Sequence, residues 1–170
     1  MKSKKNLIFL GMMGSGKSSI GKLVSKKLKL KFIDIDNEIE NKSNMKIVNI
    51  FKKKGEEYFR NLEEKITIKT LKENNIVISL GGGGFINHEI RKEVLSSHFS
   101  FWLNWDVKTL LNRIKNSQKR PIAFNLDNQE LINLIEKRSK IYSNALYKIQ
   151  CENLTKTEIL NKIIKIYEHS

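Results

Sequence analysis

Apolar and polar residues follow one another along this chain in blocks that predict strands and helices in alternation. Short apolar runs predict buried strands, whereas the longer segments between them carry apolar residues at the three- and four-residue spacing of a helix. The strands are expected at residues 7–10, 31–34, 76–80, 99–103 and, with a weaker pattern, 148–151. Helices are expected at 19–28, 37–54 (as one or two short helices), 56–72, 88–95, 107–116, 129–145 and 155–167, with Asn87 and Asp106 as N-caps.

This alternation is typical of a parallel sheet with helices on both faces, because a crossover helix brings the chain back to start the next strand in the same direction. We therefore expect an α/β protein with three α/β/α layers around a mainly five-stranded parallel sheet. A chain of 170 residues is large enough for a single domain spanning residues 1–170. Ligands of such a fold bind at the carboxyl ends of the strands.

Residues 11–18 match the pattern G-x-x-x-x-G-K-[ST] between the first expected strand and the first expected helix, which is the setting of a P-loop. Its glycines allow a tight turn, so that main-chain N–H groups and the helix N-terminus can face a polyphosphate. Lys17 is expected to reach the β- and γ-phosphates, and the Ser18 hydroxyl to bind Mg²⁺. The motif predicts a bound nucleotide but does not identify what receives the phosphate.

Acidic residues and glycines at the ends of the next two strands are candidates for the acceptor side. Asp34 and Asp36 lie two residues apart after a strand, so we expect their side chains to point the same way, one toward a metal and one toward an attacking hydroxyl. The alternative is that both only cap the next helix. The third strand contains no acidic residue, so Asp34 is the candidate for the usual metal-binding aspartate. The glycines at 81–84 would let a ligand approach the main chain closely.

Arginine is scarce in this chain, because only five of its 32 basic residues are arginine and the others are lysine. Where lysine serves almost everywhere, an arginine is a candidate for a position that needs a rigid, bidentate cation. We expect Arg91 to be an ordinary surface cation. The others are candidates for binding a carboxylate or phosphate: Arg60, Arg113, Arg120 and Arg138.

The net charge of +14 and the pI of about 9.8 come from lysines that are spread over almost every segment. This distribution favours a solvated basic surface that attracts anionic substrates over a nucleic-acid-binding face. Cys151 is the only cysteine, so no intrachain disulfide can form. No apolar stretch approaches about 18 residues, and no cleavage site follows the basic start. We expect a cytoplasmic protein that binds neither nucleic acid nor membrane.

In order and spacing, these motifs resemble the shikimate kinase family. They are the P-loop at 11–18, Asp34-x-Asp36, Phe59-Arg60, the glycines at 81–83, Arg120-Pro121 and Arg138-x-x-x-Tyr142. The P-loop is shared with many unrelated enzymes, whereas the ordered set is specific and covers nearly the whole chain. The resemblance implies ATP- and Mg²⁺-dependent phosphorylation of the shikimate 3-hydroxyl, a step toward chorismate and the aromatic amino acids. It implies a monomer with a fold like the nucleoside monophosphate kinases, a substrate-binding segment near 37–63 and a lid near 114–128.

The resemblance also implies roles for individual residues on the substrate side. Asp36 would bind the shikimate hydroxyls and accept the proton during transfer. Arg60 and Arg138 would clamp the substrate carboxylate, and Gly82 and Gly83 would make main-chain contacts to the ring.

On the nucleotide side, the resemblance places Arg113 near the adenine, and Arg120 would close on the phosphates and take part in catalysis with Lys17 and Asp36. Ser18 and, through water, Asp34 would be the metal partners. The nucleotide-binding set is Gly14, Ser15, Gly16, Lys17, Ser18, Ser19, Arg113 and Arg120. The chain departs from the family near residues 151–155, where no arginine is available to contact the base.

Three alternatives remain open. A different small-molecule kinase on the same fold, such as a gluconate or nucleotide kinase, would keep the P-loop but would not need both Arg60 and Arg138. A non-enzymatic nucleic-acid-binding protein would exploit the positive charge. A regulatory nucleotide-binding module would leave the acceptor residues unexplained.

Overall fold

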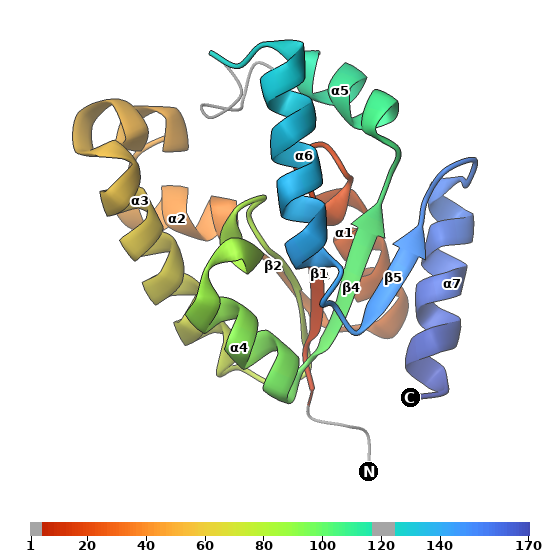
Figure 1. The fold of residues 1–170 in the computed structure, drawn as a ribbon. Coiled ribbons are helices and arrows are strands. Elements are labelled where there is room, and N and C mark those ends of the chain that lie inside the picture. Colours follow the sequence, from red (N-terminus) through yellow and green to blue (C-terminus); the bar gives the residue numbers. More distant parts are fainter. Residues whose placement is uncertain (1–4, 117–124) are drawn as a thin grey trace.

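The structure is a computed structural model that describes residues 5–116 and 125–170. Its centre is one parallel sheet (Figure 1), in which the strands follow the order β2-β3-β1-β4-β5. The strands are β1 (Leu7–Leu10), β2 (Lys31–Asp34), β3 (Ile76–Ser79), β4 (Phe99–Asn104) and β5 (Tyr147–Gln150). The expected α/β fold with a five-stranded parallel sheet is therefore confirmed, and each strand lies within one residue of the range expected from its apolar run.

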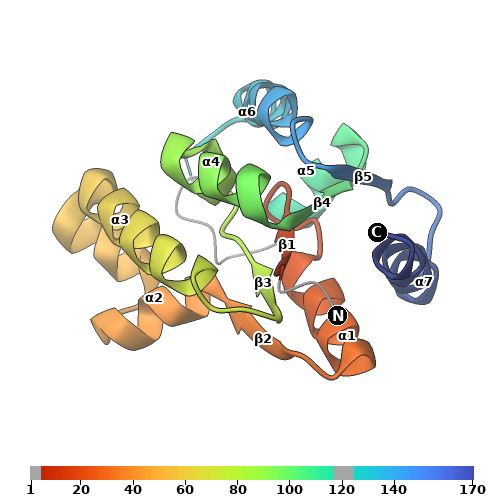
Figure 2. The ribbon, with the colours of Figure 1, turned by 90° about the horizontal axis from the view of Figure 1, so that it is seen from below.

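The helices cover both faces of this sheet. They are α1 (Lys17–Leu28), α2 (Ile35–Ser43), α3 (Ile47–Leu71), the 3₁₀ turn η1 (Gly84–Ile86), α4 (His88–Ser97), α5 (Val107–Lys115), α6 (Asn128–Tyr142) and α7 (Lys156–Glu168). Figure 2 shows α1 and α7 on one side of the sheet and α4 and α6 on the other. The two expected N-caps are confirmed, since Asn87 accepts from the Ile90 N–H and Asp106 from the Thr109 N–H.

Each face of the sheet has its own apolar core because successive side chains of a strand point to opposite faces. In β1, Leu7 and Phe9 pack with residues of α1 and α7 such as Val24 and Ile163. Ile8 and Leu10 belong to the second core, to which α2 to α6 contribute. All four β1 side chains are completely buried. The strand that leads into the P-loop is thus held on both faces.

The segment between β2 and β3 differs from expectation in where its helices begin. The residues expected as one or two short helices are divided between α2 and the first half of α3, and α3 then continues through the helix expected at 56–72. Gly55 interrupts α3 with φ 84° and ψ 171°, a conformation that glycine adopts without strain. The sequence boundary expected near residue 55 is therefore a kink within α3.

Asn6 joins three elements at the amino end of the sheet. Its fully buried side-chain amide donates to the carbonyls of Leu71 at 3.1 Å and Glu73 at 2.7 Å, and its oxygen accepts from the Ile76 N–H at 3.2 Å. One side chain thereby ties the C-terminal end of α3 and the start of β3 to the entry of β1. In the part of the chain that the structure describes, no helix combines the length and apolar character needed to cross a membrane.

Candidate active site

The P-loop turns back on itself at the carboxyl end of β1. Gly11, Gly14 and Gly16 all have positive φ, at 139°, 78° and 89°, so each occupies a region that favours glycine. Helix α1 begins at Lys17, inside the motif and two residues earlier than expected. The Lys17 ammonium is buried and donates to the carbonyls of Gly11 and Met12, both at 2.9 Å. A cation and a helix N-terminus thus lie at one turn, an arrangement suited to an anion.

Three oxygen-bearing side chains meet beside this turn. The Ser18 hydroxyl donates to Asp34 Oδ2, and the Ser79 hydroxyl lies 3.4 Å from Ser18 Oγ. Asp34 is also the N-cap of α2, where its Oδ1 accepts from the Asn37 N–H at 3.3 Å. The capping role considered as an alternative is therefore real, and the same carboxylate also faces the P-loop.

Asp36 does not extend the strand as expected. Because α2 already begins at Ile35, Asp36 lies in the first helical turn, and the alternation of a strand does not apply to it. The prediction that Asp34 and Asp36 point the same way assumed an extended strand through both residues, and that assumption is wrong. The two carboxylates have different neighbours. The four glycines at 81–84, which follow β3, are called the glycine turn. A Cβ added to Gly81 would lie 2.8 Å from Asp36 Oδ1, so Asp36 reaches this turn.

The two candidate arginines for a carboxylate converge on the same glycine turn. A Cβ added to Gly83 would lie 2.4 Å from Nη1 of Arg60, and one added to Gly82 would lie 3.6 Å from Nη1 of Arg138. Arg138 is buried and donates to the Gly82 carbonyl at 3.4 Å. Side chains from α2, α3 and α6 are thus brought together around one short loop.

Glu63 completes this cluster, although nothing in the sequence analysis singled it out. It is 2% exposed, and its Oε2 accepts from Arg60 Nη1 at 2.6 Å. Burial raises the pKa of the Glu63 carboxyl, while the charge of Arg60 and their hydrogen bond act in the opposite direction. Asp36 and Arg138 also act on this group. The only sequence signal was its position three residues after Arg60, which places both on one helix face.

Tyr142 was part of a motif, but no role followed from its position. Its buried hydroxyl donates to the Gly82 carbonyl, the same oxygen that Arg138 approaches. Burial raises the pKa of Tyr142 to about 12, so the phenol keeps the proton that it donates. Arg138 and Tyr142 therefore fix the glycine turn from α6. Arg91, by contrast, donates to the carbonyls of Phe85 and Ile86 and supports η1, outside this cluster.

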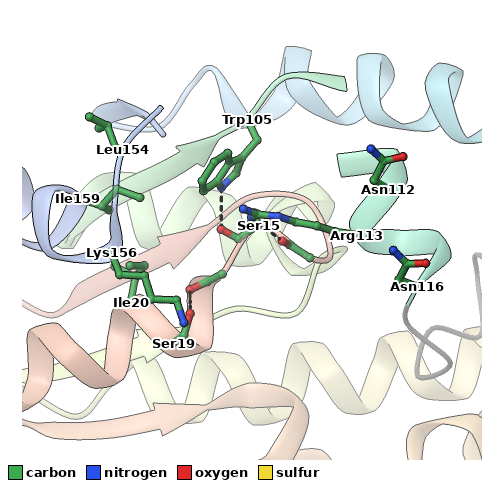
Figure 3. Close-up of a pocket in the computed structure, with 12 residues that line it drawn as sticks. Ser15, Ser19, Ile20, Trp105, Asn112, Arg113, Asn116, Leu154, Lys156 and Ile159 are labelled. Carbon is green, nitrogen blue, oxygen red and sulfur yellow. Dashed lines mark hydrogen bonds between the residues drawn. The ribbon is translucent and has the colours of Figure 1, made fainter. Parts of the chain in front are cut away.

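A pocket of about 550 Å³ opens beside the P-loop, as Figure 3 shows. Arg113 lies over the face of Trp105, with its central carbon 3.9 Å from the ring centroid, and donates to the Gly14 carbonyl at 3.2 Å. The pocket's other lining includes apolar side chains and two side-chain amides at the C-terminal end of α5: Ile20, Leu154, Ile159, Asn112 and Asn116. The pocket combines an apolar wall with a polar rim.

The structure places the sequence-predicted residues in two adjoining groups. Gly14, Ser15, Gly16 and Ser19 border the pocket together with Arg113, and Lys17 and Ser18 belong to the same loop. Asp36, Arg60 and Arg138 surround the glycine turn. The groups touch, since Arg138 Nη1 lies 4.0 Å from the Met12 sulfur. Arg120 and most of the expected lid lie outside the described residues.

Comparison with known proteins agrees with this geometry. The model of the family described as shikimate kinase matches residues 13–168. The shikimate kinase of Persephonella marina is 38% identical over 160 residues, which cover 94% of this chain and 97% of that protein.

Two solved structures share the fold over most of their length. The shikimate kinase from Acinetobacter baumannii in complex with shikimate has a TM-score of 0.92 at 26% identity, covering 99% of this chain and 95% of that one. A deoxyadenosine kinase from M.mycoides with bound dATP has a TM-score of 0.63 at 15% identity, covering 96% of this chain and 99% of that one, and shows a likeness of fold alone. The match over nearly the whole sequence decides the family: this chain belongs to the shikimate kinases.

Proposed function

We propose that this enzyme transfers the γ-phosphoryl group of MgATP to the 3-hydroxyl of shikimate, giving shikimate 3-phosphate and ADP in the biosynthesis of aromatic amino acids. The observation that carries this proposal is the convergence of Arg60 and Arg138 with Asp36 beside a P-loop. A kinase for an uncharged sugar or a nucleoside would not need two guanidiniums at its acceptor. The pair fits a hydroxylated carboxylate.

On the acceptor side, Arg60 and Arg138 would hold the carboxylate through charge-assisted hydrogen bonds. Glu63 would keep the Arg60 guanidinium in place, because the pair is 2.6 Å apart and Glu63 is buried. Asp36 would orient the reacting hydroxyl and accept its proton as the oxygen attacks phosphorus. Gly82 and Gly83 would let the ring approach the main chain closely.

On the donor side, the P-loop N–H groups and Lys17 would bind the phosphates, and Arg113 would border the base. The buried Ser15 hydroxyl has no hydrogen-bond partner among the described residues, so this loop holds a polar group that is left unsatisfied. Gly14, Gly16 and Ser19 border the same pocket. Phosphoryl transfer depends mainly on positioning and charge neutralisation, which these groups supply.

The residues beside the P-loop also fit Mg²⁺. This ion keeps several waters and takes few protein ligands, and the site offers the Ser18 hydroxyl with Asp34 behind it. Among the described residues, no group of three or more His, Cys, Asp or Glu side chains could hold a metal, so a site completed by water and phosphate suits this chain. When bound, Mg²⁺ would neutralise charge on the β- and γ-phosphates.

The test is a coupled assay of ADP release from ATP in the presence of shikimate. Turnover should require shikimate, and the methyl ester of shikimate should be a poor substrate because it lacks the anion that the arginines would bind. A panel of gluconate and nucleosides serves as the comparison. Absence of shikimate-dependent turnover would refute the proposal. The role expected of Arg120, the monomeric state and the cytoplasmic location stay predictions from the sequence.

A further inference from the structure

Trp105 contacts the P-loop from outside the motif. It follows β4 and is half-buried, and its indole N–H donates to the Ser15 carbonyl at 2.9 Å (Figure 3). Arg113, which lies on the face of the same indole, donates to the preceding carbonyl, that of Gly14. Trp105 and Arg113 therefore donate hydrogen bonds to two successive carbonyl oxygens of the P-loop.

The direction of a carbonyl decides the direction of the next N–H group. A trans peptide unit is planar, so the Ser15 carbonyl and the Gly16 N–H lie in one plane and point in opposite directions. A donor that holds the carbonyl outward therefore holds the Gly16 N–H on the opposite side. Gly16 begins α1 as its N-cap, with φ 89° and no side-chain capping bond, so its own conformation does little to restrict this peptide.

The neighbouring peptide unit is already restrained within the loop. Its N–H, that of Ser15, donates to the Met12 carbonyl at 3.1 Å, and its carbonyl is held by Arg113. The peptide between Ser15 and Gly16 depends on Trp105 for the corresponding restraint on its carbonyl. The indole thus restrains the last peptide of the loop before α1 begins.

We propose that Trp105 is a positioning residue for phosphate binding: its N–H fixes the peptide that presents the Gly16 N–H, and its face holds Arg113 against the loop. This inference rests on the proposed function only in that the P-loop binds the phosphates of ATP. In this role Trp105 acts on the phosphates through the main chain of the P-loop and through Arg113. The simpler alternative is that Trp105 only forms a wall of the base pocket, which it also lines.

Two substitutions separate the N–H from the ring. Trp105→Phe keeps an aromatic face for Arg113 and removes the donor, and should weaken MgATP binding roughly 5-fold, the value of one hydrogen bond. Trp105→Leu removes the stack as well and should weaken it roughly 20-fold. The dissociation constants of MgATP and of magnesium tripolyphosphate, which lacks a base, are measured calorimetrically without shikimate. Both ligands should lose affinity by similar factors.

Kinetics provide a readout that a merely structural role would not move. In Trp105→Phe the KM for MgATP should rise while the KM for shikimate stays within about twofold. Tyr147→Phe is the matched control, because it also removes one polar contact of an aromatic side chain, to Ser170 at 3.0 Å, away from the P-loop. It should leave both KM values unchanged. Thermal melting of each variant checks that the fold is retained.

The inference fails if Trp105→Phe binds MgATP as tightly as the wild type. It also fails if MgATP loses affinity while tripolyphosphate does not, since Trp105 would then act on the base alone. Because the binding measurements omit shikimate, they are independent of the reaction. A wild type without shikimate-dependent turnover would refute the proposed function and leave the Trp105 result to be judged by itself.

Discussion

Glycines serve the two halves of this active site for different physical reasons. In the P-loop, Gly11, Gly14 and Gly16 have positive φ, so the backbone conformation itself calls for glycine. In the glycine turn after β3, Gly83 has an ordinary φ of −99°, yet a Cβ there would lie 2.4 Å from the Arg60 guanidinium. The donor half needs glycine for its main chain, whereas the acceptor half needs it to make room for charged side chains.

This difference extends to how each half is built. The phosphate-binding part of the donor half is one contiguous segment, the P-loop, whose main-chain groups form the site. The acceptor half is assembled from α2, α3, α6 and the glycine turn. Its geometry depends on electrostatic interactions among four charged side chains: Arg60, Glu63, Asp36 and Arg138. Substitutions in the acceptor half should therefore weaken shikimate binding or slow turnover and leave the affinity for MgATP unchanged.

Asp36→Asn should give the largest effect. It removes the proposed proton acceptor while keeping the shape of the side chain, so kcat should fall roughly 100-fold or more. A turnover assay and a separate MgATP titration measure the two halves independently. Unchanged affinity for MgATP is expected; a kcat within threefold of the wild type would contradict the role of Asp36.

Arg60→Ala should raise the KM for shikimate by the equivalent of roughly 2 to 4 kcal/mol, because one partner of a largely desolvated charge pair is lost. The KM for MgATP should change little. Steady-state kinetics with each substrate varied in turn measure both values.

Arg91→Ala is the matched control for Arg60. Its guanidinium binds the carbonyls of Phe85 and Ile86, so its loss should lower the melting temperature without changing either KM. If Arg91→Ala raised the shikimate KM as much as Arg60→Ala, the effect would reflect general destabilisation.

Gly83→Ala should have an intermediate effect, raising the shikimate KM roughly tenfold, the equivalent of ~1.5 kcal/mol for a displaced charged hydrogen bond. The added methyl group would collide with Arg60, and the backbone would not be strained. In an Arg60→Ala background the same substitution should cost almost nothing further, because the colliding group is gone. Substrate kinetics on the four proteins of this cycle measure the coupling.

Gly84→Ala tests whether space is the reason. A Cβ at Gly84 would have its nearest neighbours at 3.6 Å, an ordinary contact, so both KM values should stay unchanged. Equal effects at Gly83 and Gly84 would remove the proposed distinction between the two halves.

Tyr142→Phe should have the smallest effect at neutral pH. Loss of its hydrogen bond to Gly82 should raise the shikimate KM roughly threefold, the equivalent of ~0.7 kcal/mol. The KM for MgATP again serves as the internal control.

The same variant has a clearer signature at high pH. Because the pKa of Tyr142 is raised from 10.0 to about 12, the unfolded chain loses this proton first. The free energy of unfolding should therefore fall as pH rises from 10 to about 12. Denaturant unfolding across this range should show that component in the wild type and lack it in Tyr142→Phe. Identical slopes would place the phenol in a solvated environment.

The sequence predicted the two halves unequally well, for physical reasons. The sheet, the caps and the P-loop depend on local patterns of apolar residues, glycine and capping groups, so they could be predicted from short stretches of sequence. Asp36 became a candidate through its place after a strand, and Arg60 and Arg138 through the scarcity of arginine. That the three act together was implied only by the motif order of the family, since they are separated in the chain. Burial of Glu63 and the contact of Trp105 with Ser15 arise from long-range packing, which no local pattern records. The start of α2 was also misplaced, because a strand followed at once by a helix has no intervening turn signal.

The attachment of α3 through Asn6 has a mechanical consequence. That amide fastens the far end of the helix to the β-sheet, while the break at Gly55 separates the preceding turns from the part that carries Arg60 and Glu63. The two charged side chains therefore lie on the part of α3 whose C-terminal end is fixed to the sheet. The Phe51 and Phe59 rings, with centroids 4.7 Å apart, still join the two parts of α3 across the break, so the turns before Gly55 can differ in direction without losing contact with the part that carries Arg60.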